Sequence, residues 1–398
     1  MSKSKENSIM KKLISLMLVV AAVGFVAISS ARAEEGSELE ISGNVDVVSG
    51  WQRGLKNANF ASEGLLGDGL AASAAGKSTD VFGFVVDQVE VDLAKSFGEN
   101  IRARADIDFS TFRYNEDSGA MNGAYVEQGY VTANIPAGNG MELLVGRFNS
   151  GIGLDPADRN ELNTVSFSML HRTLLPHNMT GARFGYQASD AVWFDFYVVN
   201  NLQDAIPANS DIPSGGFDVK YSWGEEGSMS WFKLSGAIGP EQATNKHYSF
   251  LGDLAAKVLV SDGFWLGAEG AYRQDNKVAG TVNARYMGGQ LKGTYAFSDI
   301  WDGTLRYGFT WDMDGGTGTV GTGRANANPL GTFFSGVAGT PFTGLGAKGQ
   351  LHDLSLATGY QITDGAKFIV EARLDMSRPN GAATGYQAGV GGQFAYSF

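Results

Sequence analysis

Large apolar residues alternate with small or charged ones along the segment WDGTLRYGFTW, residues 301–311. The odd positions are mostly large and apolar: Trp301, Gly303, Leu305, Tyr307, Phe309 and Trp311. The even positions are polar or small: Asp302, Thr304, Arg306, Gly308 and Thr310. Because successive side chains of a β-strand point to opposite faces, this pattern predicts a strand with one apolar face and one wet face.

The same period of two recurs along the chain, for example in IRARADIDF (101–109), FDVKYSW (217–223) and AKFIVEARLDM (366–376). Short segments rich in Ser, Thr, Asp and Gly are expected to form tight turns, and they lie at 96–100, 136–140, 188–191, 224–227, 260–263, 297–300 and 362–365. Longer connections are expected near 54–81, 110–123, 149–179, 200–215, 240–248, 274–284, 313–350 and 377–385. Strand, long loop, strand and short turn follow one another throughout, which predicts about 16 strands, within a range of about 14–18.

The polar faces of these strands carry many charges, as in the run of Arg102, Arg104, Asp106 and Asp108. Buried charges without partners are very costly, so this face requires water. The opposite face must then meet another apolar medium, and lipid suits it best. An open strand edge in lipid would leave unpaired amide groups at several kcal/mol each, so the sheet is expected to close.

The expected fold class is therefore all-β: a transmembrane, antiparallel, up-and-down β-barrel with short periplasmic turns and long external loops. A soluble β-sandwich or propeller is the competing interpretation, because its strands also alternate.

Aromatic residues near strand ends indicate where the membrane interfaces lie. Trp301 and Trp311 are separated by ~34 Å along a strand that rises ~3.4 Å per residue. A tilt of about 40–45° projects this separation to roughly 25 Å, the height of the apolar band of a membrane barrel. The residues expected at the interfaces are Trp223, Trp301, Trp311, Tyr396 and Phe398.

The first 33 residues are expected to be a cleaved signal peptide. The basic start MSKSKENSIMKK precedes an apolar run from Leu13 to Ile28, and SSARA offers a cleavage site after Ala33. Residues 34–398 then form a single barrel domain. Its net charge is −16, from 30 − 5 = 25 basic and 42 − 1 = 41 acidic residues. No later apolar run approaches the ~18–20 residues of a membrane helix.

Composition argues against several other functions. The chain has no Cys, which excludes disulfides and thiol chemistry, and its charge of −12 argues against nucleic-acid binding. An enzyme is not expected, because there are four His and no Gly-x-Ser-x-Gly motif. His171 and His177 form only a weak candidate for a metal pair, so no metal, cofactor or catalytic residue is predicted.

Residues from about 84 to 201 resemble the OmpL-like β-barrel porins. The resemblance rests on DQVEVDLAKSF, on VEQGYVTANIPAGNGMELLVGRFNSGIGLD and on TGARFGYQASDAVWFDFYVVNN. In addition, the final VGGQFAYSF is similar to the C-terminal strand signal that the barrel-assembly machinery recognises, with Phe398 as its last residue. The resemblance implies a channel in a Gram-negative outer membrane and provides no catalytic residues.

A barrel of about sixteen strands encloses an aqueous lumen. The residues expected to line it are Arg102, Arg104, Asp106, Asp108, Arg183, Lys220, Asp253, Lys257, Glu269, Arg273, Lys292, Arg306, Glu371, Arg373 and Asp375. The alternative is that most of these charges only pair with their neighbours and hydrate the wall.

The third long connection, residues 149–179, is the candidate constriction loop. It is too long for a simple reversal and carries three acids, Asp155, Asp158 and Glu161. We hypothesise that they face a basic wall patch that includes Arg102 and Arg104, so that a transverse field acts on solutes. The alternative is an acidic loop outside the pore. Residues 313–350 form a second long loop, rich in Gly and Thr, which is expected to be external.

The predicted function is an outer-membrane porin for passive diffusion of small hydrophilic solutes and ions. The expected partners are outer-membrane lipid and lipopolysaccharide, the barrel-assembly machinery and the solutes, with a homotrimer suggested by resemblance to porins of this size. Both termini are expected to be periplasmic. A structural or adhesive barrel with a closed lumen is the main alternative, and a lipid hydrolase within the barrel wall is a weaker one.

Overall fold

The computed structural model describes residues 38–56, 80–110, 123–136, 138, 140–202, 212–225, 229–240, 248–278, 282–314, 348–380 and 384–398. The predicted signal peptide and most of the expected loop 313–350 lie outside these ranges. No helix within them is long and apolar enough to span a membrane.

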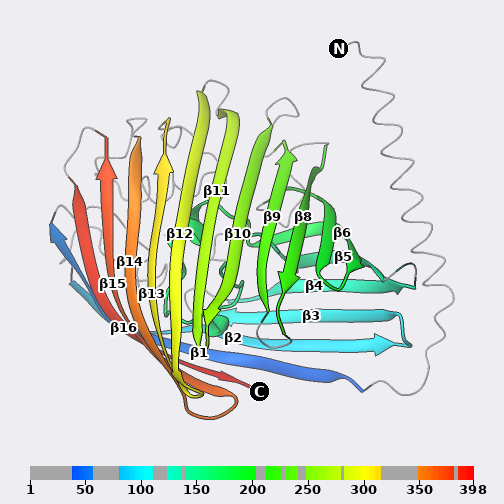
Figure 1. Cartoon of the computed structure of the whole chain (residues 1–398), viewed down its shortest axis with the longest axis horizontal. Helices are drawn as coiled ribbons and strands as arrows, with labels where there is room; N and C mark the ends of the chain where they lie inside the picture. The colour runs from blue at the N-terminus through cyan, green and yellow to red at the C-terminus, as the bar shows by residue number, and fades with distance from the viewer. Residues whose placement is uncertain are drawn as a thin grey trace.

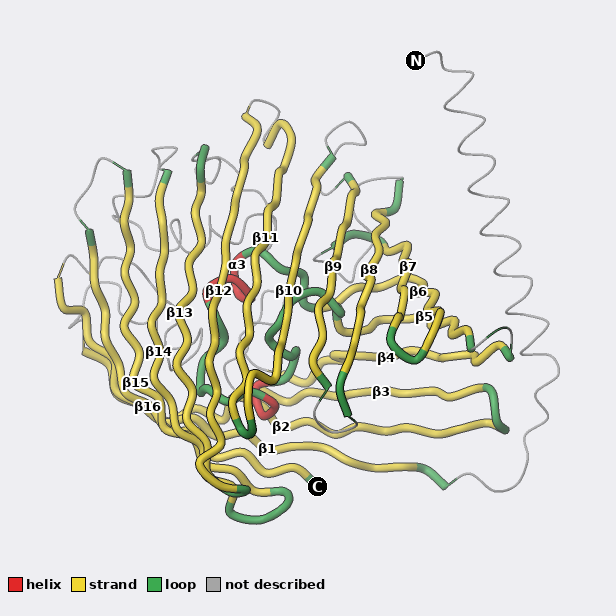
Figure 2. Tube along the Cα trace, in the orientation of Figure 1, coloured by secondary structure: helices red, strands yellow, loops and turns green. Residues whose placement is uncertain are grey.

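The described residues form sixteen antiparallel strands arranged as one closed barrel (Figures 1 and 2). The strands are β1 (Glu40–Lys56), β2 (Asp80–Phe97), β3 (Ile101–Ser110), β4 (Gly123–Ile135), β5 (Met141–Asn149), β6 (Asn178–Ser189), β7 (Val192–Val199), β8 (Ser214–Trp223), β9 (Ser230–Gly239), β10 (Ser249–Ser261), β11 (Phe264–Val278), β12 (Val282–Ser298), β13 (Trp301–Asp312), β14 (Gly349–Gln361), β15 (Ala366–Pro379) and β16 (Gly385–Ser397). Each strand pairs with its neighbours in sequence, and β1 pairs with β16 to close the ring. The predicted fold class and strand number are confirmed.

The seam of the barrel is completed by the last residue of the chain. The backbone N–H of Gly43 donates to the carbonyl oxygen of Phe398 at 3.1 Å, and the N–H of Phe398 donates to the carbonyl oxygen of Gly43 at 3.0 Å. The C-terminal residue therefore belongs to the hydrogen-bonded wall and leaves fewer unpaired amide groups at its edge.

The expected short turns all separate consecutive strands, but one expected long loop is wrong. Residues 274–284 belong mostly to strands, because β11 continues to Val278 and β12 begins at Val282. The ladder between them extends to the pair Val278 and Val282. The side chains of Gln274 and Asn276 are hydrogen-bonded at 2.6 Å, so polar side chains that suggested a loop are paired on the strand instead.

The two faces of the wall differ as the alternation predicts. Large apolar residues on the outer face are exposed, and Leu291, Leu305 and Phe84 are more than half exposed. The five predicted interface aromatics are also exposed on this face: Trp223, Trp301, Trp311, Tyr396 and Phe398. Charged residues on the inner face are largely buried, so the apolar surface of this molecule is its outside.

Residues 150–177, between β5 and β6, fold back inside the ring. They contain a short 3-10 helix, η2 (Arg159–Glu161), which contacts β1 and β16, and an α-helix, α3 (Met169–Thr173), which contacts β12, β13 and β14. Figure 2 shows both helices in red among the strands. Val165 and Leu170 of this segment have no exposed surface. The only sizeable apolar core within the described ranges forms between this segment and the inner wall.

Candidate functional site

The inner wall holds the segment 150–177, which we call the inner loop, mainly through Arg306 on β13. This guanidinium is fully buried. It donates to the Thr164 hydroxyl at 3.0 Å and to the Phe167 carbonyl oxygen at 3.1 Å, and it pairs with Asp353 at 3.2 Å. A planar donor fork of this kind can bind several oxygens at once, so one wall side chain fixes the loop backbone at several points.

A second set of wall groups on β15 binds the same stretch of the inner loop. The carboxylate of Glu371 accepts the backbone N–H and the hydroxyl of Ser166 at 2.8 and 2.7 Å. Arg373 donates to the same hydroxyl at 2.7 Å and pairs with Asp375 at 2.7 Å. Charge-assisted bonds of this length are the strong ones. These wall residues lie on the inner face as predicted, but the loop covers them and they do not line open water.

Of the three acids predicted to face Arg102 and Arg104, Asp155 binds elsewhere. Its carboxylate pairs with Lys292 on β12 at 2.9 Å and accepts the backbone N–H of Ser168 at 3.1 Å. Burial alone would raise the pKa of Asp155, but Lys292, Arg306 and His171 lower it below its ordinary value. Asp155 is therefore an ionised anchor of the inner loop, and this part of the hypothesis is wrong.

Arg102 and Arg104 are themselves paired with wall residues. Arg102 pairs with Glu40 at 2.6 Å, and Arg104 pairs with Asp106 at 2.7 Å. Glu161, which is exposed, is the loop acid whose charge interacts with Arg104. Although part of its side chain is accessible, the surrounding wall partly desolvates the carboxylate, and this effect together with the nearby Asp158 raises the pKa of Glu161, against the opposing effect of Arg104. Of the predicted arrangement of loop acids and wall arginines, only the interaction of Glu161 with Arg104 is present.

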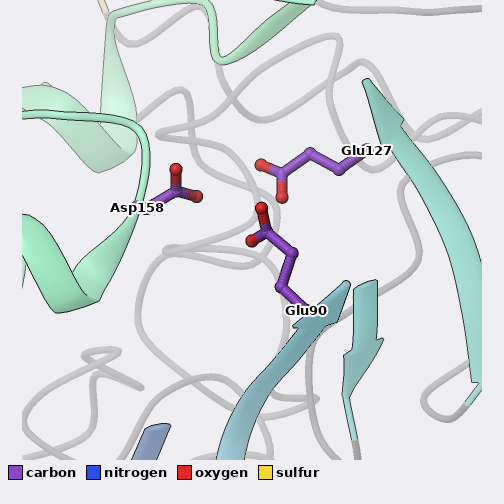
Figure 3. A group of neighbouring side chains, drawn as sticks. All are labelled: Glu90, Glu127 and Asp158. Atoms are coloured by element: carbon purple, nitrogen blue, oxygen red, sulfur yellow. The ribbon is translucent and has the colours of Figure 1, made fainter. Parts of the chain in front are cut away.

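Asp158, the third acid, joins a group of wall carboxylates from β2 and β4. The side chains of Glu90, Glu127 and Asp158 point toward one another (Figure 3), and their oxygens lie within 4.8 Å. The buried amide nitrogen of Gln88 donates to Glu90 and lies 3.4 Å from both other carboxylates. Oxygen ligands of this kind suit a hard cation such as Ca²⁺, so these three residues could hold a metal, and Glu90 with Asp92 and Asp106 forms a second group of this kind.

Two β-bulges help to build that acidic group. The register of β1 with β2 shifts beside Asp87, and the register of β3 with β4 shifts beside Glu127. A bulge adds one residue to a strand, so it changes which side chains point inward. Asp87 is buried and pairs with Arg159 of the inner loop at 2.7 Å. Strict alternation missed both acids, and no signal in the sequence marks either bulge.

The other predicted wall residues also lie on the inner face. Several are buried, and these are Asp106, Asp108, Asp253, Glu269 and Arg273. Arg273 pairs with Asp275 at 3.0 Å, and Arg183 pairs with Glu142 at 2.8 Å. Lys220 and Lys257 are exposed. The open part of the inner face therefore lies near the short turns, on β3, β8 and β10.

Three tryptophans that the sequence did not place also lie on the inner face. They are Trp193 on β7, Trp231 on β9 and Trp265 on β11, and each alternates with an outward residue such as Phe232. The Lys257 ammonium lies 4.8 Å from the Trp265 ring centre. Their inward position could not be predicted from the sequence. Large apolar residues are expected on the outer face, and alternation alone does not distinguish an inward tryptophan near a strand end from an outward one.

The two histidines of the inner loop have a packing role. The rings of Phe167, His171 and His177 are stacked, with centres 4.6 and 4.7 Å apart. A ring nitrogen of His177 is hydrogen-bonded to the carbonyl oxygen of His171 at 3.0 Å. This arrangement stabilises the turn after α3 and offers no nucleophile–base pair.

Solved structures of bacterial outer-membrane proteins share this fold at low sequence identity. The outer membrane channel DcaP of Acinetobacter baumannii has a TM-score of 0.60 and 14% identity, over 92% of this chain and 99% of that one. The anion-selective porin of Comamonas acidovorans has a TM-score of 0.56 and 10% identity, over 91% and 100%. OprB of Pseudomonas putida has a TM-score of 0.53 and 12% identity, over 91% and 94%.

No curated protein matches the sequence. A family model does match, over residues 38–398, and this range includes every strand of the barrel and the inner loop. The chain therefore belongs to the family described as putative beta-barrel porin-2, OmpL-like.

Proposed function

We propose that the protein is a passive channel for small hydrophilic solutes and ions. The observation that carries this proposal is the inverted wall: apolar side chains are exposed outside, while charged side chains and a folded loop occupy the inside. A sixteen-strand barrel is wide enough to enclose water as well as side chains. Membership of a porin family supports a non-enzymatic function.

The inner loop forms the constriction. Its wall contacts on β12–β15 cover that side of the lumen, and its exposed acid Glu161 interacts with Arg104 on β3. Solutes then pass between the η2 edge of the loop and the wall of β3. Opposite charges across this gap orient polar solutes and bias ion selectivity.

Liposome swelling with sugars of graded size tests the proposal. We expect proteoliposomes to swell in arabinose and to swell more slowly as the sugar becomes larger, because the inner loop narrows the lumen. Planar bilayers should show stepwise KCl conductance. Liposomes that contain heat-denatured protein are the control.

A structural barrel with a closed lumen is the second candidate, because the inner loop is so extensively buried. Absence of both arabinose swelling and KCl steps, with a correctly folded barrel, would support this candidate and contradict the channel.

We further propose where the barrel lies and what it contacts. The outer face contacts lipid and lipopolysaccharide, and the strand that ends at Phe398 is recognised by the barrel-assembly machinery. Both termini are periplasmic, and a homotrimer is the proposed assembly. Cross-linking in outer membranes tests the trimer, and protease treatment of intact cells tests the position of the termini.

A further inference from the structure

Three tryptophans and three lysines share the inner face of β7–β11 near the short turns. We call them the Trp–Lys strip; they are Trp193, Lys220, Trp231, Lys233, Lys257 and Trp265. The strand register places Trp193 opposite Lys220, and Trp231 opposite Lys257. Aromatic rings and ammonium groups therefore alternate across five neighbouring strands.

Two lysines of the strip, Lys220 and Lys257, carry charge that the wall does not neutralise, whereas Lys233 donates to the carbonyl oxygen of Gly151 and interacts with the carboxylates of Asp218 and Asp253. Lys220 and Lys233 lie directly opposite each other, and like charges in that position are unfavourable. Within the described ranges, neither Lys220 nor Lys257 has an ion pair, and both are exposed. In contrast, Lys292 on the next part of the wall pairs with Asp155. The charges of Lys220 and Lys257 thus remain available to a solute.

The tryptophans of the strip add flat apolar surfaces beside the lysines. The ammonium groups of Lys220 and Lys233 each lie 5.5 Å from the centre of the Trp231 ring. The Trp rings are partly exposed, so part of their surface faces the lumen. A planar organic anion can place its carboxylate beside Lys220 or Lys257 and its ring against tryptophan, and both contacts are favourable.

We propose that the Trp–Lys strip is a binding site for aromatic carboxylates on their way through the lumen. This inference rests on the proposed channel and names a class of solute for it. An inorganic anion would contact only the lysines, and a neutral aromatic compound would contact only the tryptophans. Neither would therefore bind as tightly as a compound that combines the two groups.

Benzoate, cyclohexanecarboxylate and benzamide separate the two contributions. At pH 7, benzoate added to planar bilayers should interrupt the KCl current and alter tryptophan fluorescence of the protein in detergent. Cyclohexanecarboxylate has the same charge without an aromatic ring, and we expect it to bind about two- to tenfold more weakly. Benzamide lacks the charge, and we expect binding about tenfold weaker than that of benzoate.

Variants locate the effect within the strip. Trp231→Leu should remove the preference of benzoate over cyclohexanecarboxylate, and Lys220→Gln with Lys257→Gln should weaken both anions about tenfold. The matched control is Lys95→Gln with Phe97→Leu, because this pair has the same stacking, at 5.8 Å, on the outer face. We expect the control to leave all three affinities unchanged.

The outcomes distinguish this inference from the channel proposal. Normal KCl current without any preference for benzoate, or a preference that Trp231→Leu leaves intact, overturns the inference and leaves the channel standing. Preferential benzoate binding by fluorescence without any current supports the site and overturns the channel. Loss of both signals in a folded barrel overturns both.

Discussion

At the scale of single residues, Arg306 shows how a charge on the inner face can stabilise a loop in place of lining a pore. It is completely buried, and its partners include the acids Asp353 and Glu371 as well as the loop residue Ser166. Replacing both partners of a buried ion pair by apolar residues often costs little stability. Removing one partner is costly, because the other charge stays buried and uncompensated. Arg306 therefore controls whether the inner loop can remain docked.

Replacement of this residue tests that argument. Arg306→Met should destabilise the docked loop by about 3–5 kcal/mol, because Asp353 and Glu371 lose their guanidinium partner. Trypsin should then cut after Arg159 or Arg172 of a barrel that still resists SDS, and mass spectrometry identifies the cut. Arg285→Gln is the control, because it removes an exposed ion pair with Asp314. Equal protection of the loop in both variants would contradict the assigned role.

Ion selectivity is expected to depend on pH through Glu161. The pKa of Glu161 is raised, first by burial and then by Asp158, so Glu161 becomes neutral at a higher pH than an ordinary Glu near ~4.3. As pH falls, Glu161 therefore becomes neutral before an ordinary Glu does, the lumen loses a negative charge beside Arg104, and the preference for anions should rise. Reversal potentials in a KCl gradient measure this change. Glu161→Gln should prefer anions already at pH 7 and respond less to pH; an unchanged response would show that another group titrates.

At the scale of elements, the strands could be predicted from the sequence, whereas the wall partners of the inner loop could not. Period-two alternation defined β13 and β15 because their outer residues are uniformly apolar, for example Leu305 and Leu374. The position of the inner loop in the lumen was expected from its order and length, but its partners depend on tertiary contacts. Asp155 pairs with Lys292, more than one hundred residues away, and no local pattern encodes that choice. The bulges at Asp87 and Glu127 escaped prediction for the same reason.

Gly146 in β5 lies where a larger residue does not fit. Gly146 has a φ of +144°, and a Cβ there would lie 2.2 Å from the carbonyl oxygen of Gly129 on β4. Gly146→Ala should therefore reduce stability by about 1–3 kcal/mol through backbone strain, together with poorer pairing of β4 with β5. Urea unfolding in lipid vesicles measures the loss. Gly252→Ala on β10 is the control, since a Cβ there meets no atom within 4 Å; equal losses would refute the steric explanation.

At the scale of the whole molecule, the closed ring makes the inverted distribution of side chains possible. Every strand has two neighbours, including the β1–β16 seam, so lipid meets side chains and not unpaired backbone. The charged groups then concentrate inside, where the inner loop compensates some of them and the Trp–Lys strip leaves others available. The same wall thus provides a scaffold near β12–β15 and a candidate solute path near β3–β10.

A charge on the outer face tests this sidedness directly. Leu291 lies near the middle of β12 on the outer face and is 57% exposed, whereas Phe297 is 63% exposed and lies at the short-turn end of the same strand. If lipid surrounds the barrel, Leu291→Arg should cost about 2–4 kcal/mol near the bilayer midplane, and Phe297→Arg only about 0–1 kcal/mol near the interface. Reversible unfolding by urea in phospholipid vesicles measures both values under the same conditions. Equal costs at the two positions would mean that the medium around the strand does not change with depth, and a lipid-facing wall would be ruled out. A cost that rises toward the strand centre is what a hydrocarbon layer produces, because a guanidinium near the interface reaches water and one at the midplane does not.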